Sequence, residues 1–153
     1  MVIFCNSAPI IIYSKKQGSI ETASFGSELM AAKTATELVE GLRYKLVMMG
    51  IPLEGPTYLK IDNMPVVHNC SNPASQLKKK SNSVAYHYVR ERCAMGVLEA
   101  SYVNTKSNLA DTCTKSQSVK VRQLLCSGFL RYVRRNLSQV KVISLRPLRE
   151  RLS

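Results

Sequence analysis

The run at residues 57–63 constrains the fold of this chain more than any other stretch. Apolar and polar side chains alternate from residue 58 to residue 61, and turn-forming glycine and proline residues stand on both sides of the run. This period-two pattern is typical of a short β-strand. The predicted strand ends at Asp62, and the chain has only one other aspartate, Asp111. Because ligands of α/β proteins are commonly bound at the carboxyl ends of strands, Asp62 is the first candidate functional residue.

Charge indicates the kind of partner. The 153 residues include 22 basic and 10 acidic side chains, a net charge of +12, and residues 120–153 alone carry +8. A chain of this length is expected to form one core that buries roughly 70% of its unfolded surface. The basic excess favours a polyanionic partner, for which nucleic acid is the first expectation and a ribosomal or membrane-surface partner stays open.

The five cysteines and the amino terminus indicate the compartment. The cysteines are scattered, and none forms a Cys-x-x-Cys pair. This usage favours reduced thiols in the cytosol or nucleus. The first residues have neither the charge nor the apolar length of a secretion signal or a membrane span. We therefore expect a cytoplasmic or nuclear protein that is not secreted and has no membrane partner.

Local patterns predict an α/β chain. The expected elements are a hairpin over 1–13, a long helix over 24–49, a short helix over 64–70, a helix over 83–95, a strand over 97–103, a helix opening at 107–111 and an amphipathic helix from 121. We assign residues 1–135 to one domain. Residues 136–153 form a basic tail without an assigned structure, for which disorder is one alternative.

Three acidic residues fall on three different expected elements. Glu28 lies near the start of the long helix, Asp62 at the end of the strand and Asp111 near the start of a later helix. If the fold brings these carboxylates together, they repel one another unless divalent cations bind, and carboxylate oxygens suit Mg²⁺ or Mn²⁺. Two such ions can activate water against a phosphodiester. Each acid also has a simpler interpretation: Glu28 and Asp111 as helix N-terminal charges, and Asp62 as a turn former.

Five motifs occur in one order along the chain: APIIIYSKKQ at 8–17, SELMA at 27–31, IDN at 61–63, YHYVRE at 86–91 and LADTCTK at 109–115. Together they resemble the RNase H domain of copia-type retrotransposon polyproteins over about residues 1–130. The resemblance implies an RNase H-like mixed sheet of five strands flanked by helices. It also implies that Glu28, Asp62 and Asp111 are catalytic, metal-binding residues that hold two Mg²⁺ or Mn²⁺ ions and cut the RNA strand of an RNA–DNA hybrid.

Several further residues are expected to contact nucleic acid. They are Asn63, Lys78, Lys79, Lys80, His87 and Arg90. His87 and Arg90 are three residues apart on an expected helix, so both side chains can face one way. The lysine run has a solvated loop as its alternative interpretation, and His87 that of a surface or half-buried residue.

The resemblance also implies a defect. The family's first strand, which is central in the sheet and carries the first metal-bridging aspartate, precedes the segment that matches Met1, and no acidic residue occurs here before Glu21. We expect the sheet to lack this strand. The gap would leave backbone groups unpaired, or the flanking strands would close it and shift Glu28 relative to Asp62 by one strand spacing of about 4.8 Å.

Nuclease activity is therefore expected to be weak or absent. The alternative function is a non-catalytic nucleic-acid-binding remnant of such a domain. A further alternative is a longer polyprotein, in which a reverse transcriptase domain lies upstream as a partner.

Overall fold

The computed structural model describes residues 1–5, 8–14, 24–77, 80–110, 119, 123 and 141–143. In these residues the strands are β1 (Val2–Cys5), β2 (Ala8–Ile12), β3 (Thr57–Ile61), β4 (Leu98–Tyr102) and β5 (Lys141–Ile143). The helices are α1 (Ser24–Met48), α2 (Met64–Ser71) and α3 (Ser83–Ala94), with 3₁₀ turns η1 (Lys80–Asn82) and η2 (Thr105–Ser107). The expected α/β chain is confirmed, and the hairpin, the strands at 57 and 97 and the helices at 24, 64 and 83 form as predicted. The helix predicted from 121 lies outside the described residues.

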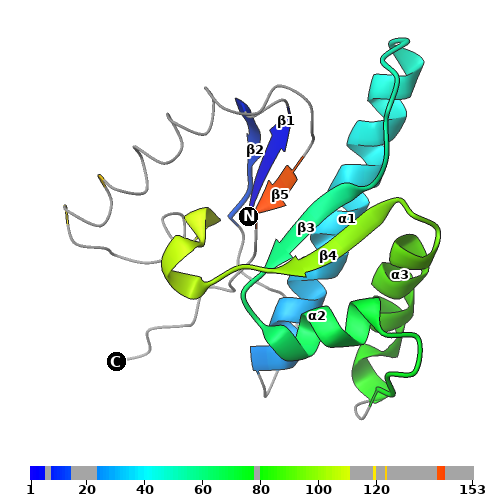
Figure 1. Ribbon diagram of the computed structural model, residues 1–153, viewed down its shortest axis with the longest axis vertical. Coiled ribbons are helices and arrows are strands. Elements are labelled where there is room, and N and C mark those ends of the chain that lie inside the picture. The colour runs from blue at the N-terminus through cyan, green and yellow to red at the C-terminus, as the bar shows by residue number, and fades with distance from the viewer. Residues whose placement is uncertain are drawn as a thin grey trace.

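The described strands form one mixed sheet in the order β2-β1-β5-β3-β4. β1 is antiparallel to both β2 and β5, whereas β3 is parallel to both β5 and β4. The short strand β5, orange in Figure 1, therefore lies between the amino-terminal hairpin and the β3–β4 pair.

The prediction of a gap at the centre of the sheet is wrong. β5 fills the position between β1 and β3, so the flanking strands neither stay unpaired there nor close onto each other. Within the tail, for which no structure was assigned, Lys141–Ile143 form β5. Unpaired backbone groups inside a protein cost about 1–3 kcal/mol each, which favours any extended segment that satisfies them. The division of the chain at residue 135 otherwise stays a prediction.

Helix α1 forms because its apolar residues recur at helical spacing along one face. Leu29, Ala32, Ala35 and Val39 are all fully buried. They belong to one core cluster with Leu59 of β3 and with buried residues of α2 and α3. The helix passes behind β3 and β4 in Figure 1. After its last turn the chain turns at Gly50, whose φ of +74° is in the left-handed region that glycine favours.

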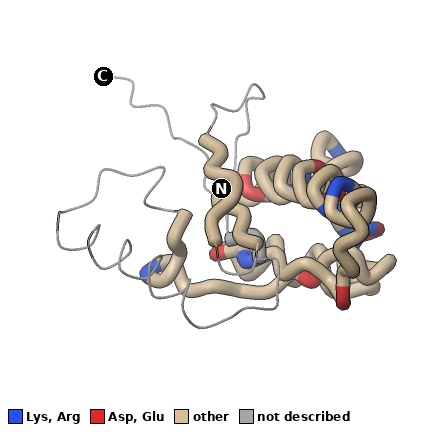
Figure 2. The backbone as a smooth tube through the Cα atoms, turned by 90° about the horizontal axis from the view of Figure 1, so that it is seen from above, with Lys and Arg blue, Asp and Glu red and all other residues tan. Residues whose placement is uncertain are grey.

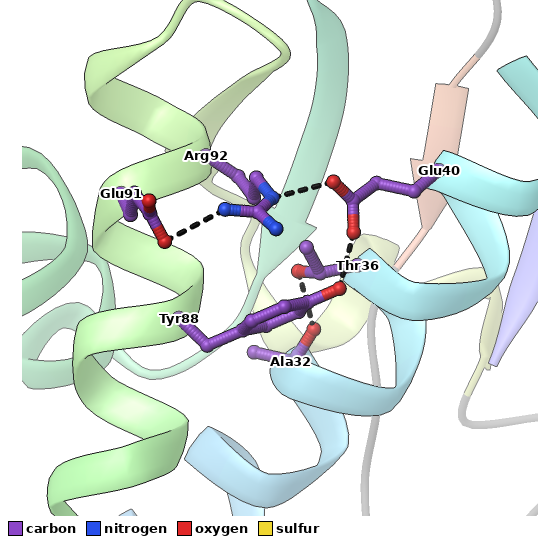
Figure 3. A network of polar contacts seen from close by, with 6 residues as sticks. All are labelled: Ala32, Thr36, Glu40, Tyr88, Glu91 and Arg92. Atoms are coloured by element: carbon purple, nitrogen blue, oxygen red, sulfur yellow. Dashed lines mark hydrogen bonds and ion pairs between the residues drawn. The ribbon is translucent and has the colours of Figure 1, made fainter. Parts of the chain in front are cut away.

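A polar network joins α1 to α3 (Figure 3). Glu40 of α1 accepts hydrogen bonds from the Tyr88 hydroxyl and the Arg92 guanidinium of α3. Although burial alone raises the pKa of Glu40, these two bonds lower it overall. Burial and the bond to Glu40 raise the pKa of Tyr88 to about 12. Lys33 also lies 6.0 Å from the Tyr88 ring. Lys33 contacts Tyr88 and the later residue Glu40 contacts the later residue Arg92, so the two helices run in the same direction.

Charge is unevenly distributed over the described part of the molecule. The strands β1 and β2 contain no charged residue, whereas α1, α3, β3 and β4 all carry charged positions (Figure 2). Among the helices described, none is long and apolar enough to cross a membrane.

Candidate functional site

Glu28 lies in the second turn of α1, next to the core residue Leu29. Its side chain is buried, with 8% of the residue exposed, and its Oε2 atom is inaccessible to solvent. A carboxylate is seldom buried unless it is bound or bonded, since burial disfavours the charged form. The location therefore marks Glu28 as more than a surface charge at a helix start.

Asp62 follows the last residue of β3 and precedes α2. The residue is half-buried, and its Oδ1 atom is inaccessible to solvent. Asn63, the next residue, caps α2: its side-chain oxygen accepts a hydrogen bond of 3.3 Å from the Val66 amide. The strand end and the capped helix thus fix the backbone on both sides of Asp62.

Arg43 fixes the direction of α1 relative to β3. Its guanidinium donates to Thr57 Oγ1 at 3.0 Å and to the Gly55 carbonyl at 3.1 Å. From this contact α1 runs back about 22 Å to Glu28, and β3 runs forward about 17 Å to Asp62. The helix and the strand are antiparallel, so both acids lie at one end of the fold, where α1 begins and β3 ends (Figure 1). We call this end the acidic end.

The third predicted acid, Asp111, lies outside the described residues, as do Lys78 and Lys79. Within the described ranges, no three His, Cys, Asp or Glu side chains form a group that could hold a metal ion. The donor chemistry of Glu28 and Asp62 nevertheless suits Mg²⁺, because both supply hard carboxylate oxygens. A metal site that includes all three acids stays a prediction.

Lys80 and His87 are exposed. The turn η1, which contains Lys80, contacts α1. Since α3 runs in the same direction as α1, its first turns, including His87, lie beside the first half of α1 rather than its far end. The His87 ring stands edge-on to Tyr86, with 5.1 Å between the ring centroids. Both side chains are accessible to a ligand.

Arg90 has an internal role that sequence reasoning missed. Its guanidinium donates to the carbonyls of Pro73 and Ser75 and to the Tyr86 hydroxyl, and it stacks on the Tyr86 ring. The half-buried guanidinium thus holds the loop after α2 against α3. The sequence signal is weak: Arg90 is four residues after Tyr86 on a helix, a spacing that allows this contact. A nucleic-acid contact of Arg90 stays a prediction.

A hollow of about 460 Å³ lies between α2, α3 and β4, and it is lined in part by Cys70 and Cys93. Burial, with a smaller effect of the neighbouring Cys93, raises the pKa of Cys70 to about 12. Burial also raises the pKa of Cys93. Because the thiolate is the reactive form, these thiols are poor nucleophiles at neutral pH.

The fold and the site define a mixed α/β protein with one acidic residue in the second turn of α1 and another directly after β3, a strand of a parallel pair. The sequence is similar to the retrovirus-related Pol polyproteins from transposons RE2 and RE1 of Arabidopsis thaliana. It is 28% identical to each over 117 residues, which cover 76% of this chain and 8% of each relative. The chain is thus similar to a segment of these Pol polyproteins and spans about 8% of the length of these curated relatives. No family model and no solved structure matches the chain.

Proposed function

We propose that this chain is an RNase H-like domain of copia type, whose activity is metal-dependent hydrolysis of the RNA strand of RNA–DNA hybrids. The observation that carries the proposal is the location of Glu28 and Asp62 at one end of the fold, each with a carboxylate oxygen inaccessible to solvent. The similarity to Pol polyproteins supports it, because it covers 76% of this chain.

The residues have separate roles in this proposal. Glu28, Asp62 and Asp111 provide the carboxylate oxygens that bind Mg²⁺ or Mn²⁺. When bound, these ions activate water and neutralise charge at the phosphodiester. The burial of Glu28 keeps bulk water from its carboxylate, which strengthens its electrostatic interactions. Lys80 and His87 contact backbone phosphates, and the 2′-hydroxyl identifies the RNA strand.

Strand β5 supports the strand that leads to this site, but it adds no acidic residue to the site. Its backbone completes the sheet beside β3, so the strand that ends at Asp62 is paired on both sides. The sequence of β5 is Lys-Val-Ile, without a carboxylate. The resemblance assigns a metal-bridging aspartate to the central strand, and β5 occupies the centre of this sheet. We therefore expect activity well below that of a site with four acids.

A cleavage assay tests the proposal. A labelled RNA–DNA hybrid is incubated with the protein and Mg²⁺, beside the variants Asp62→Asn, Glu28→Gln and Glu54→Gln. Glu54 is exposed and precedes the opposite end of β3, so its variant is the matched control for charge removal. We expect slow cleavage that Asp62→Asn and Glu28→Gln abolish and Glu54→Gln preserves. Cleavage without a divalent ion, or cleavage that survives Asp62→Asn, would contradict the proposed chemistry.

The absence of an acid in β5 favours a second candidate function, hybrid binding without turnover. The net charge of +12 supplies the attraction. For this function, affinity for the hybrid falls steeply between low and physiological salt while no product appears. Removal of one phosphate contact with Lys80→Ala is expected to reduce the slope of log affinity against log salt by about one. An affinity that does not change with salt would exclude this function.

A further inference from the structure

The centre of the sheet is occupied by a segment that is remote in sequence from its neighbours. β5 pairs with Val2, Ile3 and Phe4 of β1 on one side and with Tyr58, Leu59 and Lys60 of β3 on the other. Thirty residues, 111–140, separate β5 from the described range that ends at residue 110, and the structure describes only residues 119 and 123 among them. Among the described strands, β5 alone joins the hairpin to the β3–β4 pair through backbone pairing. We call the space between β1 and β3 that β5 fills the strand slot.

The strand slot needs an occupant. Val2, Ile3 and Phe4 on one wall and Leu59 on the other are fully buried, so an empty slot would expose core side chains and two rows of backbone groups. Release of β5 is therefore coupled to the entry of another extended segment or to loss of the sheet. Because the slot lies at the middle of the sheet, its occupant must pair on both sides.

The occupant is shorter than the slot. β5 has three residues, whereas β1 has four and β3 has five. Thr57 and Ile61, the two ends of β3, pair with β4 but not with β5. β5 is thus held by three ladder pairs to β1 and three to β3.

We propose that the strand slot is an interaction site for the same segment, Lys141–Ile143, of a second copy of this chain, which gives a strand-exchanged dimer. The argument for this occupant is that β5 itself is the segment the structure shows seated in the slot. The second copy's segment makes the same backbone pairs with β1 and β3, so no ladder pair is lost on exchange. Thirty residues of chain can extend up to about 100 Å, which is enough to reach a neighbouring sheet.

The protein concentration determines whether the closed monomer or the strand-exchanged dimer forms. Because β5 belongs to the same chain as the strand slot, its effective concentration at the slot is roughly 1 mM, so the closed monomer dominates in dilute solution. Exchange is expected when the protein is unfolded and refolded at a concentration near that value. The dimer then persists after dilution, because both slots must open at once before the copies separate.

Refolding of the full chain under reducing conditions at about 10 μM and at about 1 mM, followed by size-exclusion chromatography with light scattering, tests the proposal. We expect monomer from the first sample and a dimer fraction from the second that survives dilution for hours. A synthetic peptide of residues 139–145 in large excess is expected to suppress the dimer by competing for the slot. The same peptide with proline at the position of Val142 is the control, because proline cannot pair in a central strand.

A cross-link separates exchange from dimers that form through another surface. Ile3→Cys is placed in one tagged copy and Val142→Cys in the other, since these two positions face each other in the ladder. After co-refolding and mild oxidation, a disulfide between the two copies, identified by mass spectrometry, is expected only if strands exchange. Monomer alone at both concentrations, or a dimer without this disulfide, would overturn the proposal.

Discussion

Arg43 of α1 donates a hydrogen bond of 3.0 Å to Thr57 at the start of β3, and this bond aligns the helix with the strand. Thr57 is fully buried, so its hydroxyl has little access to water. The same guanidinium reaches the Gly55 carbonyl at 3.1 Å. These contacts fix the far end of α1 against β3, and through the rigid helix they locate Glu28 relative to Asp62.

Loss of this contact is expected to destabilise the fold. Arg43→Met keeps the length of the side chain but leaves the Thr57 hydroxyl without its charged donor, which costs about 1–3 kcal/mol in the free energy of unfolding. Thr57→Val is expected to cost less in the Arg43→Met background than in the native chain. Urea denaturation of both single variants and the double variant gives the coupling energy, expected at about 0.5–3 kcal/mol. Strictly additive effects would show that the bond does not contribute.

The contact between Glu40 and Tyr88 is expected to make stability depend on pH. Hydrogen bonds from Tyr88 and Arg92 outweigh burial and lower the pKa of Glu40 below its ordinary value of 4.5. Its stabilising effect is therefore complete above pH 4.5 and is lost as the pH falls through the lowered value. Glu40→Gln is expected to cost about 1 kcal/mol at pH 7, discounted for the partial exposure of the pair.

Denaturation at a series of pH values checks this expectation. The difference in unfolding free energy between the native chain and Glu40→Gln should shrink toward acid pH. Glu37→Gln is the control on the same helix, because Glu37 forms its ion pair with Lys33 of α1 rather than with a residue of α3. A difference for Glu40→Gln that stays constant down to the acid limit would contradict the role of its charge.

The locally determined part of the fold could be predicted from the sequence. The predicted helix 24–49 corresponds to α1, Ser24–Met48, because its apolar spacing and the glycine that ends it are local signals. The strand that precedes Asp62 is likewise predicted by local signals, because apolar and polar side chains alternate along it and turn-forming residues flank it. These elements require no knowledge of the rest of the chain.

The position of β5 could not be predicted in this way. Three residues within a basic segment give almost no periodic signal, and the strand exists because β1 and β3 leave a place between them. The Glu40–Arg92 and Arg43–Thr57 contacts also join residues that are remote in sequence. For the site, the sequence indicated the three acids, but their relative geometry depends on contacts of this non-local kind.

Arg90 is expected to contribute to stability more than to ligand binding. Arg90→Met removes the hydrogen bonds to the loop after α2 and leaves the Pro73 and Ser75 carbonyls without this donor. We expect a loss of about 1–3 kcal/mol in the free energy of unfolding. At a temperature where the variant is folded, its affinity for an RNA–DNA hybrid should stay within about twofold of the native value, whereas Lys80→Ala should weaken binding at low salt. A large loss of affinity in fully folded Arg90→Met would instead assign Arg90 to the nucleic-acid contact.

Divalent metal is expected to stabilise the native chain through Glu28 and Asp62. A metal ion that binds the folded state alone adds about 2.7 kcal/mol to the free energy of unfolding when its concentration is one hundred times its Kd. Thermal unfolding with increasing Mg²⁺ should therefore raise the Tm of the native chain and of the control Glu54→Gln. The Tm of Asp62→Asn should change little, because a neutral amide is a much weaker ligand for a hard cation. This measurement does not require turnover, so it separates a metal site that binds without cutting from the absence of a site. An equal rise of Tm in the native chain and in Asp62→Asn would mean that Mg²⁺ acts elsewhere on the protein, and the acidic end would then lose its assignment as a metal site.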